Sequence, residues 1–170
     1  GAFNKMRNLS QEQLKKGVIT SSAGNHAQGV ALSALKLKTK ATILMPITTP
    51  LVKINAVKEL MAKVILFGEN YDESYIEALR LTKERGLTFI HPFDDPEVIA
   101  GQGTIAVEII SQFGDAPDCI YVAVGGGGLI AGISTYIKNL WPNTKIIGVE
   151  PEDADAMSKS LIKNKIIELE

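Results

Sequence analysis

Cysteine is almost absent from this sequence of 170 residues, and runs of basic residues and long apolar segments are absent too. Cys119 is the only cysteine, which excludes an internal disulfide and a cysteine-based zinc site, and we expect it to be a small buried residue. The formal net charge is −1 and no Lys/Arg run occurs, so neither nucleic acid nor a membrane surface is indicated as a partner. No apolar stretch reaches the ~18 residues of a membrane span, and no signal-peptide pattern opens the chain. We therefore expect a cytoplasmic protein.

Apolar residues make up 45% of the chain, and they are arranged as strand-like runs that alternate with helix-like runs. Apolar runs that predict strands lie at 18–21, 41–46, 63–67, 88–90, 119–124 and 145–150. Helical patterns lie between them at 25–38, 50–61, 71–85, 95–112 and 127–139. A capping-box pattern at Ser10 and Gln13 opens a further short helix that Gly17 could stop, and the final stretch "LIKNKIIELE" also has a helical pattern. Strands that are apolar on both faces and separated by helices predict an α/β fold with parallel sheets flanked by helices. The "DDP" sequence at 94–96 interrupts the series, so we expect a domain boundary there.

Four consecutive glycines follow the fifth predicted strand, in "VAVGGGGLIAG" at 122–132. A glycine loop between a strand and a helix directs free backbone N–H groups and the positive end of a helix dipole toward an anion. One phosphate group would suit this loop. A dinucleotide would suit it too, because Gly126-x-Gly128-x-x-Ala131 fits the G-x-G-x-x-G/A pattern and Glu150 follows at the distance of a ribose-binding acid. A tight turn without a ligand is the third interpretation.

A second polar loop precedes the first long helix, in "TSSAGNHAQG" at 20–29. Its free N–H groups and the side chains of Ser21, Ser22 and Asn25 are suited to a carboxylate. Ordinary helix capping by Ser22 or Asn25 is the alternative, and His26 taken alone is more often a packed or capping histidine than a base. Two anion-binding loops in one α/β chain suggest a ligand with a phosphate and a substrate with a carboxylate.

Three motifs, "SSAGNHAQGVA", "HPFDDPEVIAGQGT" and "VGGGGLIAG", occur in an order and spacing that resemble the fold-type II pyridoxal-phosphate enzymes. This is the tryptophan synthase β-like fold, and among its members the chain is most similar to the threonine dehydratase (threonine ammonia-lyase) family. The resemblance covers essentially all of the chain. It implies a small domain at 17–94, with 1–16 and 95–170 forming part of the large, cofactor-binding domain.

The resemblance implies pyridoxal 5′-phosphate as the cofactor and assigns a role to each residue of the two loops. The cofactor phosphate would be bound by the backbone of Gly125, Gly126, Gly127, Gly128 and Leu129, and the pyridoxal 3′-oxygen by Asn25. The substrate carboxylate would be held by Ser22, Ala23, Gly24 and His26. Together these groups would orient an amino acid for loss of its α-proton.

The family's Schiff-base lysine lies in a segment like S-[FY]-K-x-R-G-A, and this sequence opens with "GAFNKM". Gly1 and Ala2 match the end of that motif, so the lysine would lie three residues before Gly1. We therefore expect the chain to be an internal fragment of the catalytic domain that contains no catalytic residue and is inactive on its own. The intact enzyme, expected to be a homo-oligomer, would convert L-threonine to 2-oxobutanoate and ammonia for isoleucine biosynthesis.

Serine racemase and L-serine dehydratase share these motifs, and departures from the racemase pattern favour a dehydratase. Serine racemases carry a second serine directly before "GNH", whereas this chain has Ala23, which has no exchangeable proton. Their divalent-metal site would use Glu150 and the Ala154 carbonyl, but Ala156 stands where the second acid is required, so we expect no metal. A site in which the adjacent Asp155 takes the place of that acid is the weaker alternative. A non-catalytic folded fragment and an NAD-binding Rossmann domain are the remaining alternatives.

Overall fold

A computed structural model describes residues 1–167 and divides the chain into two compact units, Gly1–Pro92 and Phe93–Glu170. Both units alternate strands with helices, and every strand pair is parallel, as the sequence predicts. The two units are described separately below. Among the described residues, no helix is long and apolar enough to cross a membrane.

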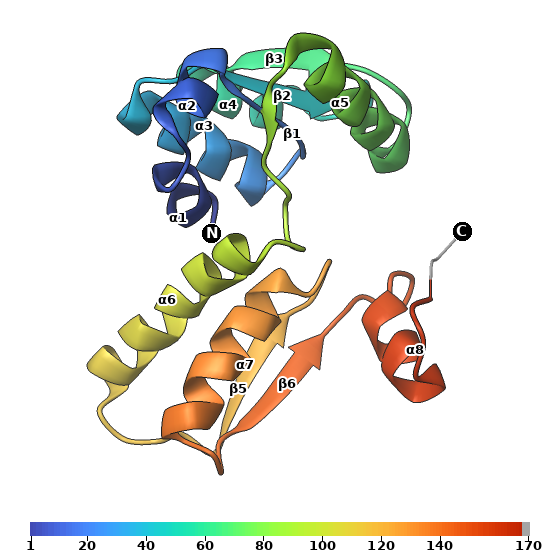
Figure 1. The fold of residues 1–170 in the computed structure, drawn as a ribbon. Coiled ribbons are helices and arrows are strands. Elements are labelled where there is room, and N and C mark those ends of the chain that lie inside the picture. The colour runs from blue at the N-terminus through green and yellow to red at the C-terminus, as the bar shows by residue number, and fades with distance from the viewer. Residues whose placement is uncertain (168–170) are drawn as a thin grey trace. The chain divides into compact units, whose positions relative to one another are not determined.

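The first unit is built on a four-stranded sheet with the strand order β3-β2-β1-β4 (Figure 1). Its strands are β1 (Val18–Ser21), β2 (Ala41–Met45), β3 (Lys63–Leu66) and β4 (Thr88–Phe89). Its helices are α1 (Ala2–Arg7), α2 (Gln11–Lys16), α3 (Asn25–Leu37), α4 (Leu51–Glu59) and α5 (Tyr71–Arg85). All four strands and all of these helices except α1 were predicted from the sequence, with bounds that differ by at most two residues.

Local signals in the sequence explain where these helices begin and end. Ser10 opens α2 with a capping box, because its hydroxyl accepts from the Gln13 N–H and the Gln13 side chain accepts from the Ser10 N–H. Gly17 ends α2 at φ 101°, a conformation that glycine adopts without steric cost. The Asn70 side chain caps α5 by accepting from the Glu73 N–H.

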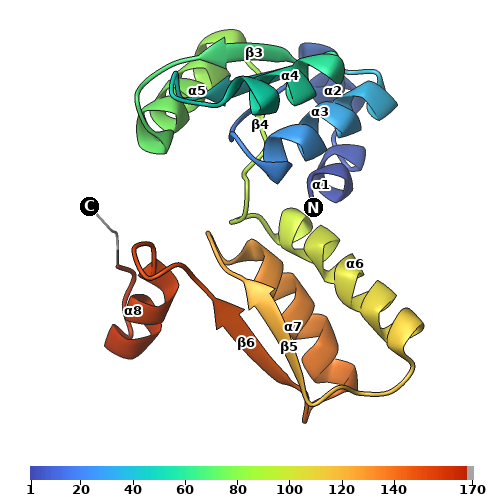
Figure 2. The ribbon, with the colours of Figure 1, turned by 180° about the vertical axis from the view of Figure 1, so that it is seen from behind.

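The two faces of the first sheet have separate hydrophobic cores. On one face, Val18 and Ile43 join a cluster that includes residues of α1, α3 and α4. On the opposite face, Ile19 and Leu44 pack with residues of α5. The ribbon seen from behind shows the same layers, with α5 on one side of the sheet and α3 on the other (Figure 2). Burial on both faces accounts for strands without polar alternation.

The second unit has a two-stranded parallel sheet, β5-β6. Its elements are α6 (Pro96–Phe113), β5 (Cys119–Ala123), α7 (Gly128–Leu140), β6 (Lys145–Val149) and α8 (Ala156–Lys163). Residues of α7 and α6 pack on the face of the sheet that carries Val122. The other face carries Tyr121 and Val149, whose side chains are 68% and 50% exposed. The sequence predicts sheets with helices on both faces. Among the described residues, the first sheet is covered in this way, whereas the second sheet is covered on one face.

Helices α6 and α7 approach so closely that no side chain fits at position 132 of their crossing without a shift of the backbone. A Cβ added to Gly132 of α7 would lie 2.3 Å from the Ile99 carbonyl oxygen and 2.7 Å from the Gly103 nitrogen, both backbone atoms of α6. A Cβ on Gly103 itself would lie 3.1 Å from the Gly132 carbonyl oxygen. The backbones of the two helices are therefore in direct contact, and the position of α7 depends on α6.

Two parts of the chain differ from the sequence-based expectation. Helix α8 begins at Ala156 and ends at Lys163, with Asn164 in a left-handed conformation, whereas the sequence suggested a helix through "LIKNKIIELE". The last part of that stretch, 168–170, lies outside the described residues. Cys119 is half-buried rather than buried. Helix α1 packs on α3 within the first unit, and the grouping of residues 1–16 with 95–170 in one domain stays a prediction.

Candidate functional site

The glycine loop connects β5 to the N-terminus of α7 in the second unit. The helix begins at Gly128, and its N-cap, Gly127, has φ 87° and no side chain to occupy the first free N–H groups. The first turn of α7 contains no acidic residue that would compete with an anionic ligand. These N–H groups and the positive end of the helix dipole form a site for one anionic group.

Two of the four glycines are required by packing against one aromatic residue. A Cβ on Gly126 would lie 2.2 Å from Cγ of Phe93, and a Cβ on Gly128 would lie 2.7 Å from the Phe93 carbonyl oxygen. At Gly125, by contrast, an added Cβ would meet no atom within 4 Å. Phe93 therefore supports the loop from one side, and Gly125 faces open space. From the sequence, the four glycines were explained by a phosphate, a dinucleotide or a tight turn, and the contact with Phe93 was missed.

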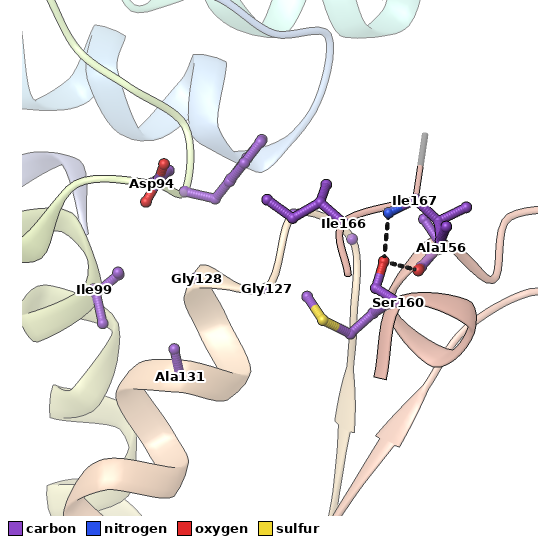
Figure 3. Close-up of a pocket in the computed structure, with 13 residues that line it drawn as sticks. Asp94, Ile99, Gly127, Gly128, Ala131, Ala156, Ser160, Ile166 and Ile167 are labelled. Carbon is purple, nitrogen blue, oxygen red and sulfur yellow. Dashed lines mark hydrogen bonds between the residues drawn. The ribbon is translucent and has the colours of Figure 1, made fainter. Parts of the chain in front are cut away.

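The glycine loop lines a cavity of about 540 Å³. Figure 3 shows Gly127, Gly128 and Ala131 on one wall of this cavity and residues of α8 on the other. Ser160 of α8 connects the helix to the segment that follows it. Its hydroxyl donates to the Ala156 carbonyl within the helix at 2.6 Å and accepts from the Ile167 N–H of that segment at 2.9 Å. The volume lies within the range of small-molecule and cofactor sites.

Glu150 caps helix α8 and does not face the glycine loop as a free acid. Its two carboxylate oxygens accept from the N–H groups of Met157 at 3.0 Å and Ser158 at 2.8 Å. The dinucleotide interpretation needed this carboxylate for a ribose, and it loses that support. Among residues 1–167, no group of three or more His, Cys, Asp or Glu side chains is placed to hold a metal ion.

The second predicted loop connects β1 to α3 in the first unit, and its helix is not capped by a side chain. The N-cap is Gly24, Asn25 is the first helical residue, and no acid lies in the first turn. The Ser22 hydroxyl accepts from the Gly24 N–H at 3.2 Å, so it stabilises the loop and not the helix. Capping by Ser22 or Asn25, the alternative left open by the sequence, is therefore wrong. The N-terminus of α3 presents its N–H groups to an anion, as α7 does.

His26 is a packed, neutral histidine. Its Nε2 lies 3.2 Å from the Ile90 carbonyl oxygen, and because a carbonyl can only accept, Nε2 carries the proton and donates. Burial lowers the pKa of His26 from 6.5 to about 4, although the hydrogen bond to Ile90 opposes this shift. The imidazole is therefore uncharged at neutral pH, and what the residue offers an anion is its backbone N–H in the first turn of α3.

The depressed pKa of His26 predicts a loss of stability in acid. The unfolded chain binds a proton at a pKa of 6.5 and the folded chain only at about 4, so unfolding takes up a proton between these values. The free energy of unfolding is expected to fall by on the order of 3 kcal/mol as the pH drops through this window. Urea unfolding at several pH values measures it. In His26→Gln the decline between pH 6.5 and 4 should become much smaller, whereas in the control His91→Gln it should persist. Equal slopes in both variants would contradict the assignment.

The structure places the predicted site residues in two groups. Residues 22–26 lie together at the N-terminus of α3, and residues 125–129 lie together at the N-terminus of α7. The roles of Ser22, Ala23, Gly24, Asn25 and His26, and of Gly125, Gly126, Gly127, Gly128 and Leu129, stay predictions. Sequence reasoning missed Phe93 and Met157 as cavity residues. Phe93 stands inside a quoted motif, but nothing in the sequence signals the role of Met157.

The sequence matches a known protein family over its whole length. The profile described as "Pyridoxal-phosphate dependent enzyme" matches residues 1–170. The chain is 56% identical over 170 residues to a threonine dehydratase of Nicotiana attenuata, covering 100% of this chain and 28% of that protein. It is 52% identical over 172 residues to the L-threonine dehydratase biosynthetic IlvA of Burkholderia multivorans, covering 99% of this chain and 34% of that protein.

Solved structures have the same fold as this chain. Isoform 2 of threonine deaminase from Solanum lycopersicum, in its processed form, superposes with a TM-score of 0.93 at 54% identity, covering 99% of this chain and 49% of that chain. Maize serine racemase also gives a TM-score of 0.93, at 36% identity, covering 99% of this chain and 51% of that chain. The chain thus spans about half the length of these solved proteins and about a third or less of the two curated relatives.

Proposed function

Since this chain belongs to the pyridoxal-phosphate-dependent enzyme family, we propose that it forms the cofactor-phosphate loop and the substrate-carboxylate loop of an L-threonine dehydratase (threonine ammonia-lyase). Such an enzyme converts L-threonine to 2-oxobutanoate and ammonia. The observation that carries the proposal is the pair of helix N-termini, on α3 and α7, that have glycine N-caps and no acid in the first turn. One suits the phosphate of the cofactor and the other the carboxylate of an amino acid.

The glycine loop fits a phosphate group. A Cβ at Gly125 would extend into open space, so the backbone there is accessible, and the N–H groups of the first turn of α7 are directed to the same end of the helix. In our proposal the backbone of Gly125, Gly126, Gly127, Gly128 and Leu129 binds the phosphate. The Leu129 side chain packs on the core of the second unit and anchors this turn.

The loop at 22–26 binds and orients the substrate in this proposal. The N–H groups of the first turn of α3 hold the carboxylate, together with Ser22, Ala23 and Gly24, and Asn25 donates to the 3′-oxygen of the pyridoxal ring. A neutral His26 adds no positive charge, so the carboxylate is held by backbone dipoles. When bound, pyridoxal phosphate acts as the electron sink that makes the α-proton of an amino acid removable.

A serine racemase is the second candidate, because the maize enzyme shares the fold. Racemisation requires a group on each face of the substrate, one to remove the α-proton and one to return it, whereas β-elimination requires a base on one face only. Ala23 precedes Gly24 at the start of the loop, and its methyl group packs against the hydrophobic core of the first unit. Because this position has no exchangeable proton, elimination is favoured over racemisation.

Assays on the product of the complete open reading frame test the proposal. With pyridoxal phosphate and L-threonine, 2-oxobutanoate and ammonia should form in equal amounts, and inorganic phosphate should compete with the cofactor for binding. L-serine should give pyruvate more slowly and no D-serine. Formation of D-serine as the main product would support the racemase instead. Absence of cofactor binding in a folded protein would overturn both candidates.

The cellular setting completes the proposal. The substrate is a free amino acid, the intact enzyme is a homo-oligomer without nucleic-acid or membrane partners, and its product enters isoleucine biosynthesis in the cytoplasm. The names of the similar proteins support the biosynthetic role, since the Burkholderia relative is called biosynthetic. Relatives named chloroplastic and mitochondrial also occur, in Arabidopsis thaliana and Schizosaccharomyces pombe respectively.

A further inference from the structure

We infer that Thr20, a buried residue of β1 outside the proposed binding loops, is a positioning residue that holds the N-terminus of α3 through the Ile90 carbonyl it shares with His26. The inference rests on the proposed function, because it concerns the turn that would bind the substrate carboxylate. Thr20 therefore acts through other groups and does not touch the ligand.

The Ile90 carbonyl is held by two side-chain donors. The Thr20 hydroxyl donates to it at 2.7 Å, and His26 Nε2 donates to it at 3.2 Å. Ile90 follows β4, and its own N–H donates to the Ile19 carbonyl at 2.9 Å, which continues the pairing of β4 with β1. Thr20 and Ile90 are both 0% exposed. A carbonyl bound on these sides has little freedom to move.

This carbonyl connects the sheet to the first turn of α3, because it accepts hydrogen bonds from Thr20 of β1 and from His26 of α3. The N-cap of α3 is a glycine, so the turn has no side-chain cap, and the Ser22 hydroxyl is directed to the loop instead. His26, the second residue of the helix, supplies the tether from its ring to Ile90. The orientation of the ring, and with it the turn whose N–H groups face the substrate, thus depends on where Thr20 holds the carbonyl.

The hydroxyl also contributes to the choice of tautomer. A carbonyl oxygen has two lone pairs and can accept two hydrogen bonds. The Ile90 oxygen accepts one from the Thr20 hydroxyl and one from His26 Nε2. While the carbonyl stays in place, Nε2 remains protonated and Nδ1 remains an acceptor. Loss of the Thr20 hydroxyl releases one of the two restraints on the carbonyl, so the His26 bond lengthens or reorients.

Thr20→Val, which keeps the shape of the side chain, tests the inference in the intact enzyme. One net hydrogen bond corresponds to a change of about 3- to 10-fold in an equilibrium constant, so the KM for L-threonine should rise by about that factor. The kcat and the affinity for pyridoxal phosphate should change less than about twofold. Thr20→Ser, which restores the hydroxyl, should restore KM.

Ser74→Ala is the matched control, because the Ser74 hydroxyl is also on a 0% exposed residue and donates to a carbonyl, that of Phe67, at 2.6 Å. It should cost similar stability and leave KM unchanged. If Thr20→Val raises KM no more than Ser74→Ala does, the inference is wrong and the role of Thr20 is structural.

The ring nitrogens of His26 give a readout that does not depend on turnover. The ¹⁵N and ring-proton NMR shifts of His26 should change in Thr20→Val and stay as in the wild type in Ser74→Ala and Thr20→Ser. Unchanged shifts in Thr20→Val would overturn the inference even in an active enzyme. Changed shifts in a protein that does not convert threonine would support the tether and refute the proposed function.

Discussion

Replacing Gly126 by alanine is expected to lower the free energy of unfolding of the second unit by about 2 to 3 kcal/mol, even without a cofactor. The new methyl group would lie 2.2 Å from Cγ of Phe93. Rotation of the ring about the Cβ–Cγ bond leaves Cγ in place and does not relieve this overlap. Either Phe93 has to change its χ1 rotamer or the loop has to move. Urea unfolding without pyridoxal phosphate measures the loss.

Gly125→Ala is the control for that experiment, because its methyl group would meet no atom within 4 Å. This variant should keep the stability of the wild type within about 0.5 kcal/mol. In our proposal its methyl group extends toward the phosphate, so the affinity for pyridoxal phosphate should fall by about 10-fold or more. The variant at Gly126 thus tests whether packing requires a glycine, and the variant at Gly125 tests whether the ligand requires one.

A double-mutant cycle with Phe93→Ala identifies the partner of Gly126. If the ring causes the overlap, Gly126→Ala should cost much less in the Phe93→Ala background, with a coupling energy of about 2 kcal/mol. Additive effects of the two substitutions would refute the packing explanation. Equal stabilities of Gly126→Ala and Gly125→Ala would refute it as well.

Gly132→Ala is expected to lower the free energy of unfolding by about 3 kcal/mol or more. Its Cβ would lie 2.3 Å from the Ile99 carbonyl oxygen and 2.7 Å from the Gly103 nitrogen, and backbone atoms of a helix cannot turn aside. Alanine has a higher helix propensity than glycine by about 1 kcal/mol, which offsets only part of the cost. Thermal and urea unfolding, followed by circular dichroism, measure the change.

Gly103→Ala serves as the graded comparison. Its Cβ would lie 3.1 Å from the Gly132 carbonyl oxygen, a contact that a few tenths of an ångström of movement relieves. The helix propensity of alanine can then balance most of the cost, so we expect a change within about 1 kcal/mol. A Gly132→Ala variant as stable as Gly103→Ala would show that the helices separate freely. In that case the position of α7, and of the glycine loop at its N-terminus, does not depend on α6.

The sequence predicted the strands and most of the helices because their signals are local. Ser10 and Gln13 form a capping box within four residues, and Asp95 with Pro96 marks the start of α6. Helix α1 was missed because it spans only Ala2–Arg7 and has no side-chain cap at its start. The end of α8 was misplaced because "LIKNKIIELE" has helical composition, whereas Asn164 ends the helix in a left-handed turn.

The candidate site was predicted less completely, because its remaining features depend on contacts between distant residues. Phe93 reaches Gly126 across more than thirty positions, and Thr20 reaches Ile90 across seventy. From the sequence, Glu150 was considered as a ribose ligand in the dinucleotide alternative and as one ligand of the racemase-type metal site, because it follows a strand. Its actual partners, the N–H groups of Met157 and Ser158, became visible only when α8 was placed. Local sequence patterns therefore indicate which loops are candidates for binding an anion. The residues that hold these loops in place are determined by tertiary contacts, which the sequence pattern does not show.

The contact between Phe93 and Gly126 also limits the order in which this protein can evolve. While a phenylalanine occupies position 93, any larger residue at 126 meets its ring, so a substitution at 126 that comes first is expected to cost stability. A lineage that shortens residue 93 first removes most of this cost and opens position 126 to change. The cost of the substitution at 126 thus depends on the order of the two changes, which is magnitude epistasis set by a single ring.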